Sequence, residues 1–523
     1  MSNFIENFWN ENAHLWNGEL VTRFPPEPNG FPHAGHAKSL AANHGMAAKF
    51  GGKMNLRMDD TNPEKESKVF EDAIKEMVEW LGFKWDGEVK YASDYFDKLH
   101  DLAKALIKEG SAYMDFTDRE TMRANKGSLT SSGVRSPDAE KEPAWHFEMF
   151  ERMKLGEFEE GACVLRAKID MSSPNMNLRD PVIYRVKRIH HNRTGDKWCV
   201  YPAYSYAHPA SDYFERISLS LCTLEFEDLR PFYDWVVEKC SKIMPDPLMK
   251  HVPVELEFAR LELDRGMTSK RKINALVEEG RVDGWDDPRL VTLAGLRRRG
   301  FTPSAIRKFC EEAGLSKANA TTPFMRMEDF LRLDLDESAP RRFVVARPIK
   351  LDVIDGPETY EVEASNHPKD ESMGTRWVEF SSEMWIDAED VRAAGKAEKG
   401  FKRVEPGAVL RIMPGFVLEC LAVELSENGD PCKVVCKRSE GKPRATIHGL
   451  SRNSAKLMEI WEPDVIESEE DEPSSRLVVR HGYAEPGVMI TKGTFHAVRY
   501  GYCVLDRNNN SRLILSTKLR SSI

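Results

Sequence analysis

The stretch from residue 20 to residue 59 constrains the fold more than any other part of the chain. Residues 20–24 (LVTRF) are apolar and β-branched, which predicts a buried strand. A turn rich in Pro and Gly follows, and a helical pattern then runs from about His33 to the stop at Gly51-Gly52. Residues 53–59 (KMNLRMD) predict the next strand. Strand, turn, helix and strand in this order form a βαβ unit, so the sheet should be parallel.

Two histidines fall in the first turn of the predicted helix. Unpaired backbone N–H groups and the positive end of the helix dipole lie there, and both favour an anion near His33 and His36. Gly35 has no side chain and would let a flat, phosphorylated ligand approach the backbone. An H-x-G-H pattern is short enough to match by chance, and two surface histidines at a helix start would explain it as well.

The residues around the histidines make the pattern specific. RFPPEPNG-x-x-H-x-GHAKS at 23–39 resembles the HIGH signature of class I aminoacyl-tRNA synthetases, in the extended form of the glutaminyl and eukaryotic-type glutamyl enzymes. EFARLELDRGMTSKRKIN at 257–274 resembles their KMSKS-type signature, with Thr268 in place of Met. Alone, the SKRK run would be a solvated basic face or a general polyanion patch. Two signatures in one chain favour the family.

The resemblance implies an α/β fold: a Rossmann-like parallel catalytic sheet with an acceptor-end-binding insertion, a helical subdomain and two C-terminal antiparallel β-barrels that read the anticodon. The residues support the barrels, because apolar positions alternate with period two over many short runs from Phe343 onward. The predicted limits are 15–93 and 204–256 for the halves of the catalytic domain, 94–203 for the insertion, 257–333 for the signature loop and helices, and 334–523 for the barrels.

The resemblance also implies the site residues. Catalytic roles are carried by His33, His36 and Lys270, whose ammonium would meet the charge that develops on pyrophosphate. The implied ATP contacts are Glu27, Pro28, Asn29, Ala34, Gly35, His36, Ala37, Lys38, Ser39, Leu40, Thr223, Arg260, Leu261, Thr268, Ser269 and Lys270. The implied glutamine contacts are Arg23, Asp59, Tyr204, Cys222 and Glu255. The implied tRNA contacts are Leu129, Asp228, Lys317, Arg341 and Arg403.

Several of these residues have plain structural alternatives. A single Asp after a strand, such as Asp59, is more often a turn cap than a ligand. Leu129 matches a leucine that wedges open the first base pair of the acceptor stem, but it could also pack locally in its loop. We also expect Asn62 to cap a helix that starts at Pro63.

Position 222 separates the two candidate amino acids. Glutaminyl enzymes have LCTLEF here, as this chain does, whereas glutamyl enzymes carry an arginine in place of the cysteine. A buried arginine would pair with the glutamate carboxylate and fit a neutral amide poorly. We expect no cation at the side-chain end of the pocket. Ser205 replaces the usual Asp and Glu255 the usual Gln, which leaves the selectivity somewhat open.

The expected reaction is therefore the ATP-dependent ligation of L-glutamine to tRNA(Gln) through a glutaminyl-adenylate. A glutamyl-tRNA synthetase, or a paralogue that binds tRNA without catalysis, are the alternatives. The resemblance implies Mg²⁺ with ATP, and we expect no metal site of the protein's own and a monomer. No apolar run reaches the ~18 residues of a membrane helix. Nine scattered cysteines favour a reducing cytoplasm, and the net charge of −10 requires any tRNA surface to be local.

Overall fold

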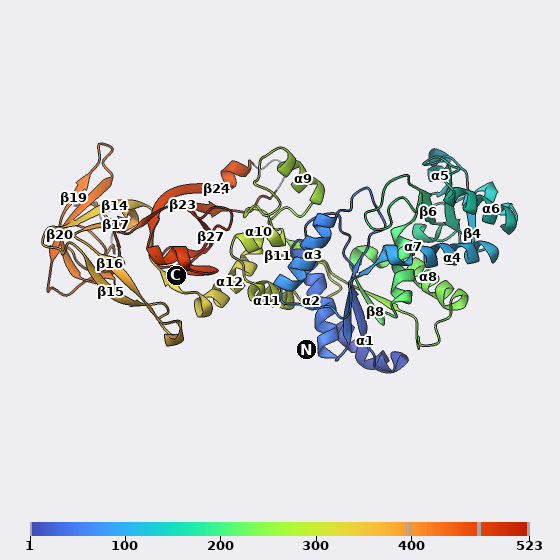
Figure 1. Cartoon of the computed structure of the whole chain (residues 1–523), viewed down its shortest axis with the longest axis horizontal. Helices are drawn as coiled ribbons and strands as arrows, with labels where there is room; N and C mark the ends of the chain where they lie inside the picture. The colour runs from blue at the N-terminus through green and yellow to red at the C-terminus, as the bar shows by residue number, and fades with distance from the viewer. Residues whose placement is uncertain (1–2, 394, 397–399, 414, 468–471, 520–523) are drawn as a thin grey trace. The chain divides into compact units, whose positions relative to one another are not determined.

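The computed structural model describes residues 3–393, 395–396, 400–413, 415–467 and 472–519 (Figure 1). The chain divides into two compact units. The first comprises Met1–Leu263 and Cys310–Thr322, and the second comprises Asp264–Phe309 and Pro323–Ile523. No helix among the described residues is long and apolar enough to cross a membrane.

The first unit is built on the predicted parallel sheet. Its strands are β1 (Val21–Phe24), β2 (Lys53–Met58), β3 (Lys90–Tyr91), β8 (Leu219–Thr223) and β9 (Val254–Phe258). β1 pairs with β2, β2 with β3, and β8 with β9, all in parallel. The N–H of Ser218 donates to the carbonyl of Val21 at 2.8 Å, which places β8 on the free side of β1. The βαβ prediction is confirmed, because α2 (Ala34–Lys49) connects β1 to β2.

The helix predicted to begin at Pro63 begins later. α3 (Lys68–Trp80) has Ser67 as its N-cap, whose side chain accepts from the N–H of Phe70 at 3.5 Å. The backbone N–H of Asn62 is instead bound by the carboxyl of Glu66 at 2.6 Å. The Asn62 cap was therefore wrong, because residues 62–66 form a turn that closes on itself before the helix begins.

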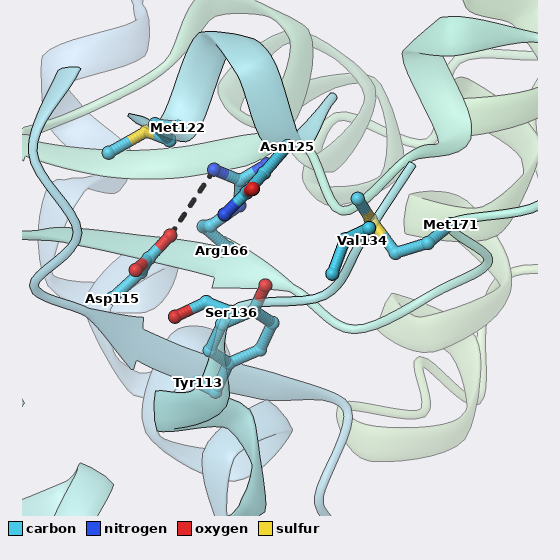
Figure 2. Close-up of a pocket in the computed structure, with 8 residues that line it drawn as sticks. All are labelled: Tyr113, Asp115, Met122, Asn125, Val134, Ser136, Arg166 and Met171. Atoms are coloured by element: carbon cyan, nitrogen blue, oxygen red, sulfur yellow. Dashed lines mark hydrogen bonds and ion pairs between the residues drawn. The ribbon is translucent and has the colours of Figure 1, made fainter. Parts of the chain in front are cut away.

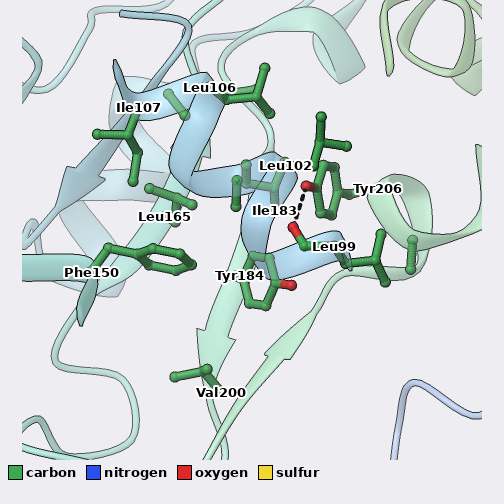
Figure 3. Close-up of a cluster of buried hydrophobic side chains, with 14 of the residues drawn as sticks. Leu99, Leu102, Leu106, Ile107, Phe150, Leu165, Ile183, Tyr184, Val200 and Tyr206 are labelled. Atoms are coloured by element: carbon green, nitrogen blue, oxygen red, sulfur yellow. Dashed lines mark hydrogen bonds between the residues drawn. The ribbon is translucent and has the colours of Figure 1, made fainter. Parts of the chain in front are cut away.

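The insertion shares its core with the catalytic domain. Its antiparallel sheet has the order β4 (Ala112–Asp115), β5 (Val164–Ala167), β6 (Val182–Val186) and β7 (Val200–Pro202). α4 (Phe96–Lys108) and α6 (Pro143–Lys154) pack on it, and α7 (Tyr204–Phe214) and α8 (Arg230–Ile243) contribute to the same buried cluster. Figure 3 shows Tyr206 of α7 donating its hydroxyl to the carbonyl of Leu99 on α4, at 2.8 Å. The common core fixes the insertion to the helix that carries Tyr204.

The second unit holds further helices and two barrels. The helices are α9 (Lys270–Glu278), α10 (Leu293–Arg298) and α12 (Phe324–Ser338), while α11 (Pro303–Ala313) spans the limit between the units. One barrel contains β14 (Pro348–Val353), β17 (Glu383–Asp387), β18 (Val409–Met413), β19 (Val417–Leu425), β20 (Pro431–Arg438), β21 (Ala445–His448) and β22 (Leu450–Ser451). The other contains β12 (Arg341–Arg342), β13 (Val344–Val345), β23 (Lys456–Pro463), β24 (Leu477–Ala484), β25 (Thr494–Ala497), β26 (Gly501–Leu505) and β27 (Arg512–Lys518).

Each of these sheets curls until its two edges nearly meet. The edge strands β21 and β22 of one sheet are separated in the chain by Gly449, and the edge strands β12 and β13 of the other by Phe343. The two predicted barrels are thus confirmed. Their strands are not all antiparallel, because β14–β20, β18–β21, β12–β25 and β23–β27 pair in parallel.

Candidate active site

The site begins where the chain leaves the parallel sheet. β1 has β2 on one side and β8 on the other, and the helical crossovers from β1 and β8 lead in opposite directions along the sheet. Ligands of open α/β sheets bind at such a switch point, beyond the carboxyl ends of the strands. Residues 25–33 and the start of α2 follow β1 there, and Thr223 ends β8.

His33 and His36 form the N-terminal cap of α2. His33 is the N-cap residue, and its Nδ1 accepts from the N–H of Gly35 at 3.1 Å. The N–H of His33 donates to Nδ1 of His36 at 3.2 Å. Because both Nδ1 atoms accept, each neutral ring carries its proton on Nε2. A Cβ at residue 35 would lie 2.8 Å from Cε1 of His33, so the cap itself requires glycine.

The other residues of the HIGH signature divide into exposed and buried positions. Glu27 is exposed and accepts from the side chain of Asn29 at 2.5 Å. The core-facing residues of the signature, between 2% and 5% exposed, are Ala34, Ala37, Lys38 and Leu40. Nζ of Lys38 donates to the carbonyl of Ala259 at 2.7 Å, and burial lowers its pKa. Lys38 therefore ties α2 to the residue that follows β9.

Two further residues that the resemblance implies for ATP lie at or just after strand ends of the first unit. The hydroxyl of Thr223 donates to the carboxylate of Glu225 at 2.9 Å. The side chain of Arg260 is 57% exposed and lies 3.9 Å from Glu225 and 3.7 Å from Glu262. These acidic partners are weak at such distances, so the guanidinium remains available to a phosphate.

Asp59 lies at the end of β2 and is buried. Nε of Arg57 donates to its Oδ1 at 3.0 Å, and Nδ1 of His208 lies 2.9 Å from its Oδ2. Burial alone would raise the pKa of Asp59, but Arg57 and His208 outweigh it and hold the pKa below its ordinary value. Asp59 thus remains an anion, which a positively charged amino group requires.

His208 contacts both arginines of the site. Nη2 of Arg23 lies 2.6 Å from its Nε2, and Nη2 of Arg57 lies 3.1 Å from its Nδ1. Nδ1 also lies 2.9 Å from Oδ2 of Asp59. One imidazole therefore connects Arg23 to Asp59.

Arg23 belongs to a buried ionic cluster that the sequence did not reveal. Its Nε donates to Asp212 at 3.1 Å, and Nη1 of Arg57 donates to Asp212 at 2.8 Å and to Glu215 at 3.2 Å. Each of these side chains, like that of Asp59, is at most 2% exposed. Two arginines face three carboxylates, which leaves one negative charge. A bound α-ammonium would balance that charge.

Part of this cluster had a signal in the sequence. Tyr204, His208 and Asp212 are spaced by four residues, which places them on one face of α7. Arg57 and Asp59 alternate along β2, so they share a side of the sheet. Nothing in the sequence indicated that the α7 residues meet the β2 residues, because His208 is about 150 residues from Arg57 and Asp59.

Cys222 and Glu255 lie together beside this cluster. Burial raises the pKa of the Cys222 thiol, and burial also raises the pKa of Glu255 to about 7, with its hydrogen bond to Cys222 and the charge of Arg23 acting against it. Tyr204 is half-buried and close to both. Nη2 of Arg23 lies 3.4 Å from Sγ of Cys222. The expectation of no cation at this end of the pocket was therefore wrong.

The charge of Arg23 is nevertheless already paired. Besides Asp212 and His208, its guanidinium donates to the carbonyl of Leu221 at 3.0 Å and to the hydroxyl of Ser220 at 2.5 Å. A carboxylate ligand would have to compete with these partners in a site without solvent. Arg23 is thus a poor substitute for a dedicated glutamate-binding arginine.

The tRNA-site residues of the first unit lie on its surface. Leu129 is 81% exposed, so the alternative that it packs locally is wrong. Asp228 accepts through its carbonyl from the side chains of Asn175 and Asn177, at 2.7 and 3.1 Å, and its own side chain is exposed. Nζ of Lys317 lies 5.2 Å from the ring centre of Phe4.

Thr268, Ser269, Lys270, Arg341 and Arg403 belong to the second unit. Thr268 and Ser269 are exposed, and Ser269 precedes α9, so Lys270 lies at the positive end of that helix. Arg341 donates to the carbonyl of Ala339 at 2.7 Å, and Arg403 donates to Asp390 at 2.7 Å. The two arginines are held in place by these local contacts.

Comparison with known proteins agrees with this geometry. Residues 19–337 match the catalytic domain of the class I tRNA synthetases for glutamate and glutamine (E and Q), and residues 339–438 match their anticodon-binding domain. The chain is 44% identical to a glutamine–tRNA ligase of Nitrosomonas europaea, over 97% of this chain and 95% of that one.

Two further relatives carry the same name. A glutamine–tRNA ligase of Clostridium perfringens is 43% identical, over 98% of this chain and 95% of that one. One of Pseudomonas syringae pv. tomato is 48% identical, over 82% of this chain and 76% of that one. The chain belongs to the glutamine–tRNA ligase family of class I aminoacyl-tRNA synthetases, as its two signatures predict.

Proposed function

We propose that this chain ligates L-glutamine to the 3′ end of tRNA(Gln) in two ATP-dependent steps. In the first, an oxygen of the glutamine α-carboxylate attacks the α-phosphorus of ATP, and the bond to pyrophosphate breaks. In the second, a hydroxyl of the terminal ribose attacks the carbonyl carbon of the adenylate, and AMP leaves. The buried cluster around Asp59, Arg23 and His208 is the observation that carries this assignment.

The protein contributes positioning and electrostatics rather than a covalent intermediate. Asp59 holds the α-ammonium, because it is a buried anion in a cluster with one excess negative charge. The cap formed by His33 and His36 uses the N–H groups of His33 and Gly35, so the start of α2 would attract phosphate through the positive end of its dipole and the two imidazoles. Lys270 is proposed to stabilise the departing pyrophosphate.

Selection of glutamine rests on the side-chain end of the pocket. Tyr204, Cys222 and Glu255 offer polar atoms to a neutral amide, and Arg23 already has partners for its charge. A glutamate carboxylate would add a second negative charge to a buried, negatively charged cluster. That cost favours glutamine over the glutamyl alternative.

ATP is proposed to enter as its magnesium complex. The family implies ATP, and Mg²⁺ commonly binds through substrate phosphates with few protein ligands. Within the described ranges, no group of three or more His, Cys, Asp or Glu side chains could hold a metal ion. No step of the proposal depends on a metal site of the protein's own.

The proposed setting completes the assignment. We propose a cytoplasmic monomer whose domains follow the limits predicted from the sequence, with Leu129, Asp228 and Lys317 at the acceptor end and Arg341 and Arg403 at the anticodon. The dispersed free cysteines support a reducing compartment. Sedimentation of the purified chain at micromolar concentration tests the monomer.

The decisive experiment is aminoacylation of purified tRNA pools with labelled glutamine and, separately, labelled glutamate. Charging of tRNA(Gln) with glutamine supports the proposal. Equal or better charging with glutamate would replace it with the glutamyl alternative. Absence of charging with either amino acid, while tRNA still binds, would favour a paralogue that binds tRNA without catalysis.

A further inference from the structure

The loop that carries Leu129 is closed at its base. The N–H of Val134 donates to the carbonyl of Asn125 at 2.7 Å, and the N–H of Gly133 donates to the carbonyl of Met171 at 2.7 Å. Between these two contacts the chain makes a compact turn with Leu129 near its tip. At 81% exposure, Leu129 gains almost nothing from packing in the free protein. Its position must therefore be set by the backbone of the loop.

A single buried guanidinium occupies the interior of this loop. Nη1 of Arg179 lies 2.9 Å from the carbonyl oxygen of Lys126, 2.9 Å from that of Ser128 and 2.8 Å from that of Ser131. Its Nε donates to the carbonyl of Ser173 at 2.8 Å. Arg179 is only 2% exposed. These bonds hold the loop on both sides of Leu129.

The loop is folded tightly onto this guanidinium. Gly127 has a φ of +74°, and a Cβ there would lie 2.9 Å from Nη1 of Arg179 and 2.7 Å from the carbonyl oxygen of Ser131. Figure 2 shows the base of the loop, where Asn125, Val134 and Met171 line a cavity of about 10 Å³. That volume is at the lower limit for one water molecule, so the base has little room to move.

Arg179 is itself anchored in the insertion. It precedes Asp180, which is fully buried and accepts from Nε of Arg135 at 2.7 Å, from the hydroxyl of Tyr113 at 3.1 Å and from the N–H of Ile169 at 2.8 Å. Tyr113 belongs to β4, so the chain segment that carries Arg179 is tied to the sheet. The guanidinium thus links the exposed loop to the antiparallel sheet of the insertion.

We infer that Arg179 is a positioning residue that holds Leu129 in the exposed place from which it opens the acceptor stem. The inference rests on the proposed role of Leu129 as the wedge. Opening a terminal base pair requires the wedge to resist the pair's stacking, and a loop that could relax would give way instead. A preorganised loop avoids the entropy loss of ordering the wedge on each encounter.

The test uses two transcripts of tRNA(Gln), one with a Watson–Crick first pair in the acceptor stem and one with a mismatch at that pair. The variants are Arg179→Met, Arg179→Lys and Leu129→Ala, each assayed for kcat/KM with both transcripts. Arg179→Met should lower kcat/KM about 30-fold with the paired transcript. The mismatched transcript should restore it to within about threefold of the wild type, because no pair remains to be opened.

With the paired transcript, the kcat/KM of Arg179→Lys should lie between those of the wild type and Arg179→Met, because one ammonium can bind some of the loop carbonyls that the guanidinium binds. Tyr206→Phe is the matched control. Tyr206 is buried in the core of the insertion and donates to the carbonyl of Leu99, not to the loop or to Asp180. Any loss of activity should be equal with both transcripts. Hydrogen exchange of residues 126–133 should rise in Arg179→Met without tRNA and stay unchanged in Tyr206→Phe.

The outcomes separate the inference from the proposal beneath it. An equal loss with both transcripts in Arg179→Met and Arg179→Lys, or no loss, would overturn the positioning role. If the loss of kcat/KM in Leu129→Ala depends on the first base pair and the loss in the Arg179 variants does not, only the role of Arg179 is wrongly assigned. If Leu129→Ala shows no such dependence, the wedge and the inference both fail, while glutaminylation of tRNA would stand.

Discussion

Glu255 gives the selectivity of the pocket a measurable pH dependence. Burial raises its pKa to about 7, opposed by the hydrogen bond to Cys222 and by Arg23 and reinforced by the charges of Glu257 and Asp212. It is mostly protonated at pH 6 and mostly ionised at pH 8. A glutamate carboxylate that contacts Cys222 would lie beside Glu255, because Glu255 is hydrogen-bonded to Cys222. At a separation of about 6 Å and an effective dielectric constant of about 20, two carboxylates repel by about 3 kcal/mol, or about 100-fold.

The observable change is smaller than this repulsion, because glutamate can still select the protonated enzyme. That form falls from about nine-tenths to about one-tenth of the enzyme between pH 6 and pH 8, so glutamate use should fall about tenfold. Glutamine use should change little, since either form offers an oxygen to the amide. The ratio of kcat/KM for glutamine to that for glutamate should therefore rise about tenfold over this range.

Glu255→Gln removes the titration and keeps the shape of the side chain. In this variant the ratio of kcat/KM for glutamine to that for glutamate should not change between pH 6 and pH 8, and it should match the wild-type ratio at pH 6. The assay is tRNA charging with each amino acid at saturating ATP, and steps common to both substrates cancel in the ratio. A wild-type ratio that does not change with pH, or a variant that retains the slope, would refute this account of Glu255.

The remaining predictions concern catalysis, coupling and stability. Lys270→Ala should slow adenylate formation by a factor of roughly 10²–10³, a loss of ~2.7–4 kcal/mol of transition-state stabilisation, while tRNA affinity stays nearly unchanged. Near-normal turnover at saturating substrates would contradict the role of Lys270. ATP–pyrophosphate exchange should require tRNA if binding completes the site by induced fit, and exchange without tRNA would exclude that coupling. Cys222→Arg should weaken glutamine use, because the new cation would face Arg23 in the position now 3.4 Å from it; unchanged kcat/KM for glutamine would argue against this placement. Burial alone would raise the pKa of Asp212, but Arg23 and Arg57 hold that pKa well below its ordinary value. The ionised Asp212 therefore stabilises the fold near neutrality, and this stabilisation is lost as the pH falls through the acidic range. Asp212→Asn should therefore reduce local stability by about 3–5 kcal/mol at pH 7, measured by hydrogen exchange of residues 219–223. Asp246→Asn is the control, because it breaks a partly exposed pair with Arg216 and should cost at most about 1 kcal/mol. Equal effects of the two substitutions would contradict this account of Asp212.

Local patterns in the sequence determined the frame of the site. A β-branched run, a Pro- and Gly-rich turn and a helical period predicted β1, α2 and β2, because each depends on neighbours within a few residues. The signature resemblance supplied the family and the residues of the pocket. The Asn62 cap was predicted wrongly, because Glu66 binds the N–H of Asn62 and the helix begins only after Ser67.

Only the tertiary structure decided which charged side chains meet in the pocket and which contacts fix them. Arg23 and Asp212 are 189 residues apart, and Arg57 and Asp212 are 155 apart, so no periodicity could bring them together. The contacts of His208, the satisfied donors of Arg23 and the contacts of Arg179 with the loop that carries Leu129 follow from distances across the fold. Buried charges must find partners wherever the chain provides them, and that choice is made when the sheet, its insertion and α7 pack into one core.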